Sequence, residues 1–221
     1  MAVAAPQDQG AQDQGDQGSP ARDPQRSEGQ GGRTAQGDSV KRGELDQYWR
    51  KAIQGRPAEA KVIDPASVVT APWVRLKCKY GCEMYGREYC CPPETPTPEQ
   101  TSEILSCYRR AILFHYRAAK KEGVNRTKAR KAFLDALVEL EGDMFKEGYY
   151  KAFALLSGPC SRCAECAKSE NKPCHFGSLA RPSMESCGID VYQTAWNNGF
   201  PIQPLRHKGE TQNLYCLMLV D

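Results

Sequence analysis

The feature that most constrains this chain is a series of cysteines at short, regular intervals. Cys160, Cys163 and Cys166 follow one another at three-residue steps, and Cys174 comes after a longer gap. Three thiolates at such steps wrap a loop around one bulky group, as in the C-x2-C-x2-C run that ligates iron–sulfur clusters. Structural zinc sites more often join two separate pairs of ligands across a longer insert. The series therefore predicts a metal site and favours a [4Fe–4S] cluster over zinc. The spacing leaves open whether Cys174 completes that site or reaches another one.

A second group of cysteines lies earlier in the chain, at Cys78, Cys82, Cys90 and Cys91. Adjacent side chains of an extended backbone point to opposite sides, so Cys90 and Cys91 are not expected to bind the same iron. One of the two is predicted to be a ligand and the other to pack, and the prolines at 92–93 favour Cys91 as the ligand. A cluster held by Cys78, Cys82 and Cys91 has one position free for an external ligand, as a catalytic zinc ion does.

The other cysteines and the histidines give weaker signals. Cys107 and Cys216 stand alone beside apolar residues and are predicted to be small core residues. Cys187 precedes a glycine turn, and its role stays open. His115 lies in an apolar run and is predicted to be a hydrogen-bonded core residue. His175 follows Cys174 directly, but a single histidine without a paired carboxylate supports no acid–base mechanism.

The compartment decides how 11 cysteines in 221 residues behave. The N-terminal segment has neither the basic region nor the apolar run of a secretory signal. No stretch approaches the roughly 18 uninterrupted apolar residues of a membrane span. The sequence therefore predicts a cytoplasmic protein, in which thiols stay reduced and clustered cysteines bind metal or carry out redox chemistry.

Composition divides the chain in two. Residues 1–40 are rich in Gln, Gly and Asp and are predicted to be a disordered tail, whereas residues 41–221 are predicted to form a single cysteine-rich metal-binding domain. The net charge is +3, and the main basic cluster, at 126–131, is predicted to be a solvated helix face. Because no aromatic residues interleave with it, nucleic-acid binding is not expected. No glycine-rich nucleotide motif is present, so nucleotide and flavin cofactors are not supported either.

Hydrophobic periodicity predicts a small layered α/β domain with a central mixed sheet, flanking helices and two cysteine-rich metal-binding loops. The clearest helix spans 126–146. Thr97, Pro98 and Gln100 form the start signal of another helix, with a capping box. The other elements expected are helices at 44–49 and 189–197, buried strands at 111–116 and 150–157, a short strand or loop at 66–76, and a terminal hairpin of 202–206 with 214–220.

Several short motifs in fixed order suggest a family. They are Cys78-x3-Cys82 with Tyr85-Gly86, Cys91-Pro92-Pro93 leading to Pro96-Thr97-Pro98-Glu99, the series from Cys160 to Cys174, Arg181-Pro182-Ser183-Met184-Glu185, and Gly188-Ile189-Asp190. Over roughly residues 70–221 the chain resembles the family catalogued as predicted metal-binding proteins, the domain of unknown function numbered 2284. The resemblance implies metal binding through these cysteines, with iron–sulfur favoured, and implies no settled reaction. The chain departs from the family pattern at His175, where a basic residue such as arginine is expected.

Three functions fit these observations. The first is an iron–sulfur protein with one or two [4Fe–4S] clusters that acts in electron transfer or redox chemistry, together with a redox partner protein that the sequence does not identify. The second is an interaction module in which zinc is structural. The third is an enzyme that uses an open-site cluster as a Lewis acid. Whether the chain is an enzyme is left open.

Overall fold

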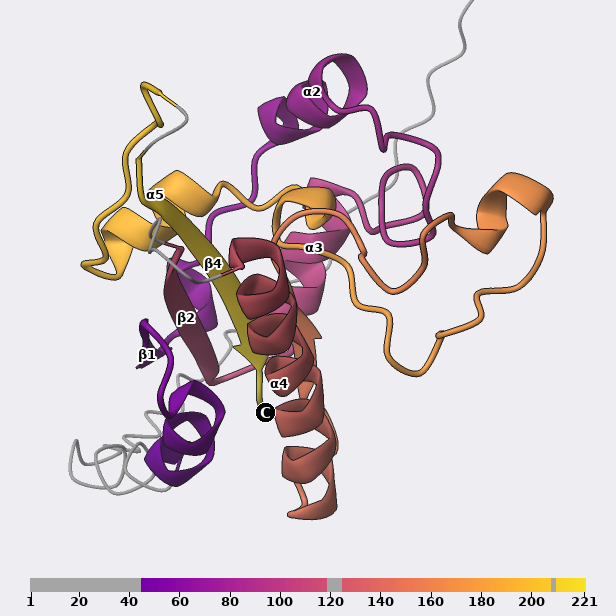
Figure 1. The fold of residues 1–221 in the computed structure, drawn as a ribbon. Helices are drawn as coiled ribbons and strands as arrows, with labels where there is room; N and C mark the ends of the chain where they lie inside the picture. The colour runs from indigo at the N-terminus through magenta and orange to yellow at the C-terminus, as the bar shows by residue number, and fades with distance from the viewer. Residues whose placement is uncertain (1–44, 119–124, 208–209) are drawn as a thin grey trace, which may run out of the picture. The chain divides into compact units, whose positions relative to one another are not determined.

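A four-stranded sheet forms the centre of the fold (Figure 1). In the computed structural model, which describes residues 45–118, 125–207 and 210–221, the strands lie in the order β1-β2-β4-β3. Their bounds are Ala58–Ile63 for β1, Ala111–Ala118 for β2, Phe153–Leu155 for β3 and Gln212–Leu219 for β4. The predicted layered α/β domain is confirmed. The strand pairs of this sheet are antiparallel, whereas the sequence predicted a mixed sheet. A parallel pairing occurs as an isolated bridge between Leu156 and Ser183.

Strand β2 is apolar along most of its length because both faces of the sheet are covered. Phe114 and Tyr116 pack into a core cluster on one face, while Ala111 and Leu113 pack into a second cluster on the other. Successive side chains of a strand alternate between faces. An uninterrupted apolar run is therefore typical of a strand buried on both sides, which is why the sequence predicted this one.

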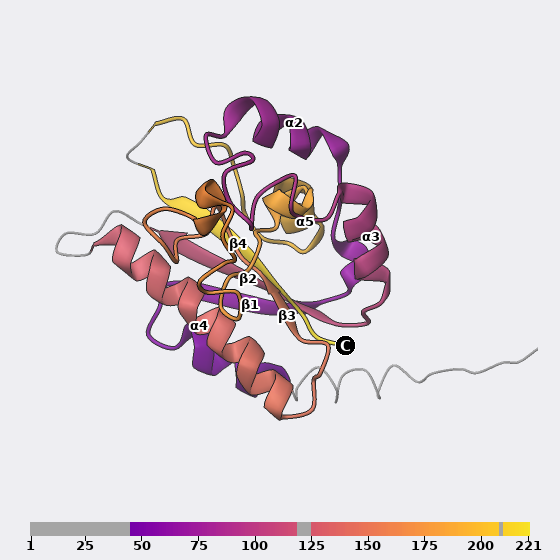
Figure 2. The same ribbon diagram turned by 90° about the vertical axis from the view of Figure 1, so that its right-hand side faces the viewer.

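Helices cover the two faces of the sheet (Figure 2). Helix α4 (Arg126–Lys146) contributes Phe133 and Leu137 to one cluster, and the structure confirms the predicted bounds of this helix. Helices α3 (Pro98–Ser106) and α5 (Val191–Asn197) contribute to the cluster on the opposite face. At the start of α3, the Thr97 hydroxyl accepts a hydrogen bond from the backbone N–H of Gln100. The Gln100 side chain in turn accepts one from the N–H of Thr97, so the predicted capping box is confirmed.

Two elements were missed by the sequence analysis. Helix α2 (Pro72–Gly81) occupies part of the segment 66–76 that was expected to be a strand or loop. Its Leu76 and Tyr80 are exposed, so α2 has no wide buried stripe from which helical periodicity could be recognised. Strand β1 (Ala58–Ile63) lies at the edge of the sheet with an alternating burial pattern, in a segment that its flanking glycine and prolines made look like a connector.

The predicted terminal hairpin is wrong. Residues 202–206 form no strand, whereas β4 (Gln212–Leu219) covers most of the predicted 214–220. Strand β4 pairs with β2 on one side and with β3 on the other, instead of with residues 202–206. The physical reason is that β2 is buried on both faces and needs a long apolar partner, which β4 provides.

All described residues belong to one compact unit, Ala35–Asp221. The tail predicted for residues 1–40 lies outside the described residues. Among the residues that the structure does describe, no helix is long and apolar enough to cross a membrane.

Candidate metal centre

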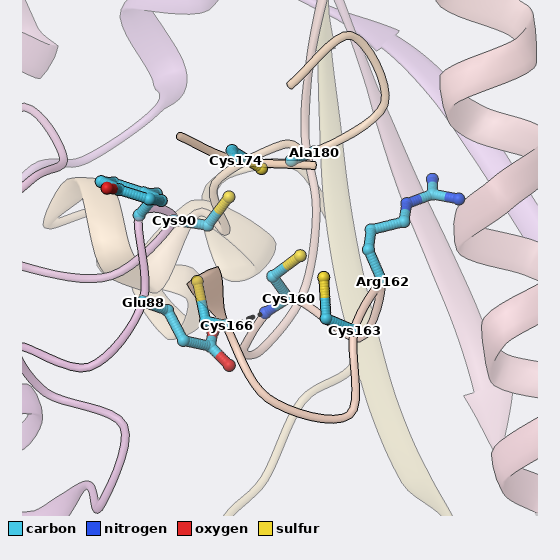
Figure 3. A pocket seen from close by; sticks show the side chains of 9 residues that line it. Glu88, Cys90, Cys160, Arg162, Cys163, Cys166, Cys174 and Ala180 are labelled. Atoms are coloured by element: carbon cyan, nitrogen blue, oxygen red, sulfur yellow. Dashed lines mark hydrogen bonds between the residues drawn. The ribbon is translucent and has the colours of Figure 1, made fainter. Parts of the chain in front are cut away.

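Five cysteines from two distant segments line one hollow, which we call the five-cysteine hollow (Figure 3). They are Cys90, Cys160, Cys163, Cys166 and Cys174. The sulfur atoms of these side chains surround a common space, while the Arg162 side chain points away from it (Figure 3). The structure thus brings together the whole cysteine series after β3, with Cys174 included, and adds a thiol from 70 residues earlier in the chain.

Within the hollow, the thiol of Cys90 forms a hydrogen bond with the thiol of Cys160. As the donor in that bond, and because it is buried, Cys90 has a raised pKa. Cys160, the acceptor, has its pKa lowered to about 6. A metal or cluster bound here would take the place of this thiol–thiol hydrogen bond.

A second set of thiols, the three-cysteine site, consists of Cys78, Cys82 and Cys91. Cys78 lies on α2, and Cys82 follows its last residue. The three sulfurs are close enough to affect one another's charge: burial and then Cys82 raise the pKa of Cys78, and both thiols contribute to the raised pKa of Cys91. The largest cause at Cys91 is burial, followed by the carboxylate of Glu88, and together they raise its pKa to about 12.

Cys90 and Cys91 lie in different surroundings, but the backbone there is a turn, with a hydrogen bond from the N–H of Cys91 to the carbonyl of Glu88, and not the extended chain that the sequence analysis assumed. The expectation that one of the two is a ligand and the other packs stays a prediction. Cys90 lines the five-cysteine hollow, whereas Cys91 is close enough to Cys78 and Cys82 for their charges to raise its pKa. Each thiol faces a cysteine group of its own, so the two groups meet at consecutive residues.

Sequence reasoning missed Glu88, which lies between the two groups. Its side chain is buried, with 6% of the residue exposed. One carboxylate oxygen, Oε2, accepts a hydrogen bond from the backbone N–H of Cys160 at 3.1 Å and another from the thiol of Cys91 at 3.5 Å. The sequence feature that could have indicated Glu88 is its position, since it is an acidic residue two positions before a pair of adjacent cysteines.

Further contacts fasten the loop of the cysteine series to the segment around Glu88. The Tyr89 hydroxyl donates to the backbone carbonyl of Lys172 at 2.9 Å. The Lys168 ammonium forms an ion pair with Glu94 at 2.8 Å, and the lysine side chain is largely covered. Together with the contacts of Glu88 and Cys90, these bonds fix the position of one cysteine segment against the other.

Two of the three lone cysteines and the histidine of β2 lie in the core. Cys216 is buried, as predicted, and His115 is the predicted hydrogen-bonded core residue, with Glu59 and Asn213 each 2.8 Å from a ring nitrogen. Cys187, whose role the sequence left open, packs in the core on the α5 face.

The prediction that Cys107 is a core residue is wrong. Its side chain is exposed, because it caps the C-terminus of α3 beyond the buried Leu105. His175 is exposed next to Cys174.

The donor set fits a metal bound by sulfur. The five-cysteine hollow presents only thiols as soft ligands, which suits both iron–sulfur clusters and structural zinc. Within residues 45–118, 125–207 and 210–221, no three Cys, His, Asp or Glu side chains are gathered closely enough to hold a single metal ion between them.

Comparison with known proteins matches the chain to a protein family. The family model described as "Predicted metal-binding protein (DUF2284)" matches residues 61–220. No curated protein and no solved structure match the chain. The matched span contains both cysteine groups.

Proposed function

The chain belongs to this family of predicted metal-binding proteins, and we propose that it binds [4Fe–4S] clusters at two cysteine sites and acts in electron transfer or redox chemistry. Residues 41–221 would form one metal-binding domain that carries both sites. The five-cysteine hollow would hold one cluster. Cys78, Cys82 and Cys91 would hold a second.

The observation that carries the proposal is the shared hollow. Cys90 and the cysteine series are far apart in sequence, yet their thiols line one space in which every soft donor is a sulfur. Five candidate thiols exceed the four that a single cluster needs. A zinc centre remains the alternative outcome of the experiment, since four thiolates also suit zinc.

The chain's own residues would perform distinct tasks at the two sites. Cys160, Cys163 and Cys166 would wrap a cluster from one side while Cys90 approaches from the other. Glu88 would hold the backbone of Cys160 in place through its hydrogen bond. The thiol of Cys91 would lose its proton, and with it the hydrogen bond to Glu88, when it binds a cluster. When bound, a [4Fe–4S] cluster supplies one-electron transfer at a potential set by its surroundings.

Anaerobic purification followed by iron, zinc and sulfide analysis tests the proposal. Two clusters correspond to about eight irons per chain and to a broad visible absorption that dithionite bleaches. About four irons would contradict the second cluster. Colourless protein with stoichiometric zinc would overturn both and favour a structural zinc module.

Multiple cysteine substitutions identify the ligands. The triple substitution Cys160→Ala, Cys163→Ala and Cys166→Ala should remove about half of the iron, because it leaves only two thiols, Cys90 and Cys174, around the hollow. Cys107→Ala is the matched control, since Cys107 is exposed and belongs to neither group. Equal iron in all three proteins would show that the series is not the ligand set.

A further inference from the structure

A cavity of about 410 Å³ lies beside the three-cysteine site, between α2, α5 and β4. One face of α2 forms a wall, with Trp73 and Lys77 at positions i and i+4 and Cys78 next to Lys77. Tyr192 of α5 and Tyr215 of β4 lie among aliphatic side chains on the other walls. The size is that of small-molecule pockets, which measure about 300–1,000 Å³ and are mostly apolar with a few polar groups.

The aromatic and aliphatic side chains that line the cavity determine which shape of ligand fits it. Trp73 and Tyr192 offer aromatic surface to the cavity, and flat ring systems stack favourably on such side chains. Tyr215 lies behind them, 1% exposed and stacked on His115. The aliphatic residues of the lining, among them Ile202 and Leu214, add apolar surface. A planar, largely apolar molecule therefore fits better than a polar or branched one.

The charges around the cavity select against anions. Asp190 contributes a carboxyl group to the lining, and Glu185 contributes a second one, whose pKa is raised by burial and which therefore adds less negative charge. Lys77 contributes one ammonium group, which is exposed. The thiols of Cys78 and Cys82 add further groups that become negative when they lose a proton or bind metal. An uncharged or cationic molecule is favoured, and aromatic side chains also attract cations.

The two cysteine groups differ in the room beside them. Within the five-cysteine hollow the free space is about 20 Å³, about enough for one water molecule, so its cysteines would have to move apart to admit the proposed cluster. The three-cysteine site, in contrast, opens on the larger cavity through Cys78 and Cys82. An organic molecule can approach the second group and has no comparable space at the first.

We propose that this cavity is a binding site for a flat, uncharged or cationic aromatic molecule, which lies against Cys78 and Cys82 and so meets the three-cysteine site. Contact between this molecule and a metal at the three-cysteine site rests on the function proposed above, whereas binding of the molecule in the cavity does not. The five-cysteine hollow would then serve electron transfer alone, and the three-cysteine site would face the substrate.

Quinoline and 2-naphthoate test the proposal, because the two probes share a bicyclic shape and differ in charge. Titration followed by ligand-detected NMR should show quinoline binding with a dissociation constant of about 1 mM or lower, as expected of a small ligand. The anion 2-naphthoate should bind at least about tenfold more weakly. Absence of quinoline binding at millimolar concentration, or equal binding of both probes, would overturn the proposal.

Two variants on the same helix localise the probe. Trp73→Ala removes an aromatic wall from a residue that is already 46% exposed, so the fold should survive, and quinoline binding should weaken at least about fivefold. Tyr80→Ala is the control: Tyr80 is 77% exposed on α2 and lies outside the cavity lining. Equal affinity of the two variants would place the probe elsewhere and contradict the proposal.

Titrating both the metal-free and the metal-loaded full chain separates the two proposals. Quinoline binding by protein that takes up no cluster supports the cavity while the proposed function fails. Cluster loading without quinoline binding overturns the cavity alone. In loaded protein, quinoline should change the electron paramagnetic resonance spectrum, and Cys78→Ala should abolish that change. An unaltered spectrum would contradict the contact with the three-cysteine site.

Discussion

At the scale of single residues, Cys90 and Cys91 are adjacent in sequence but lie at different cysteine groups. Their divergence was predicted for an extended backbone, whereas the structure has a hydrogen-bonded turn between Glu88 and Cys91. Their destinations could not be predicted, because the partner of Cys90 is Cys160, far along the chain, and nothing local to the pair indicates that contact. Glu88 was missed for the same reason, since its burial depends on the segment that packs over it.

Replacing each member of the pair separately should affect different sites. Cys90→Ser is expected to alter the signal of the cluster in the five-cysteine hollow, where four thiols remain, and to leave the three-cysteine site loaded. Cys91→Ser should remove about half of the iron, because the three-cysteine site has no other described thiol to replace it. Iron analysis combined with electron paramagnetic resonance of each variant measures this. Identical spectra from Cys90→Ser and Cys91→Ser would mean that both thiols serve one site.

At the scale of helices and strands, the sequence predicted those elements that carry a clear hydrophobic stripe or a capping motif of their own. Helix α4 carries a buried stripe with Phe133 and Leu137, and α3 begins with the Thr97 capping box, so both follow from sequence. Helix α2 was missed because its apolar side chains serve an exposed surface and a cavity wall instead of a core stripe. The place of β4 beside β2 could not be predicted, since it depends on pairing between segments about 100 residues apart.

One ion pair fastens the chain after the cysteine series to the helical layer. Arg181 donates from Nε to Glu141 Oε2 at 2.8 Å and from a terminal nitrogen to Oε1 at 2.5 Å. Glu141 lies on α4, and the exposed fractions of the two side chains are 14% and 10%. Glu141 also accepts a hydrogen bond from the backbone N–H of Ala154 in β3. The pair therefore joins α4, the sheet and the segment that leads to Glu185.

Arg181→Ala should lower the free energy of unfolding by about 3 kcal/mol, because it leaves a buried carboxylate without its charged partner. Denaturant unfolding of the metal-free protein measures the loss. The control is Lys172→Ala, which removes the exposed ion pair with Glu170 and should change the stability by less than about 1 kcal/mol. If Arg181→Ala were no more destabilising than Lys172→Ala, the pair would not be what holds this segment.

At the scale of the whole molecule, the two core clusters and the two cysteine groups are built from different residues. The clusters lie on the faces of the sheet and include Cys187 and Cys216, whereas none of the eight candidate ligands belongs to either. The cysteine segments are held by a few polar contacts, such as those of Glu88 and Lys168. The sheet and its helices should therefore fold without metal, while the cysteine segments depend on it for their stability.

Hydrogen exchange with and without metal tests this division. Binding to the native state stabilises the parts that form the site, so removing metal with a chelator should lower amide protection at least about tenfold in residues 78–94 and 158–180. Amides of β2, β4 and α4 should keep their protection, because both core clusters remain intact. The variant with Cys160→Ala, Cys163→Ala and Cys166→Ala serves as the reference, since the chelator should have little further effect on residues 158–180 there. Uniform loss of protection across the sheet would mean that metal governs the folding of the whole domain, and unchanged exchange in the cysteine segments would mean that their polar contacts suffice without it.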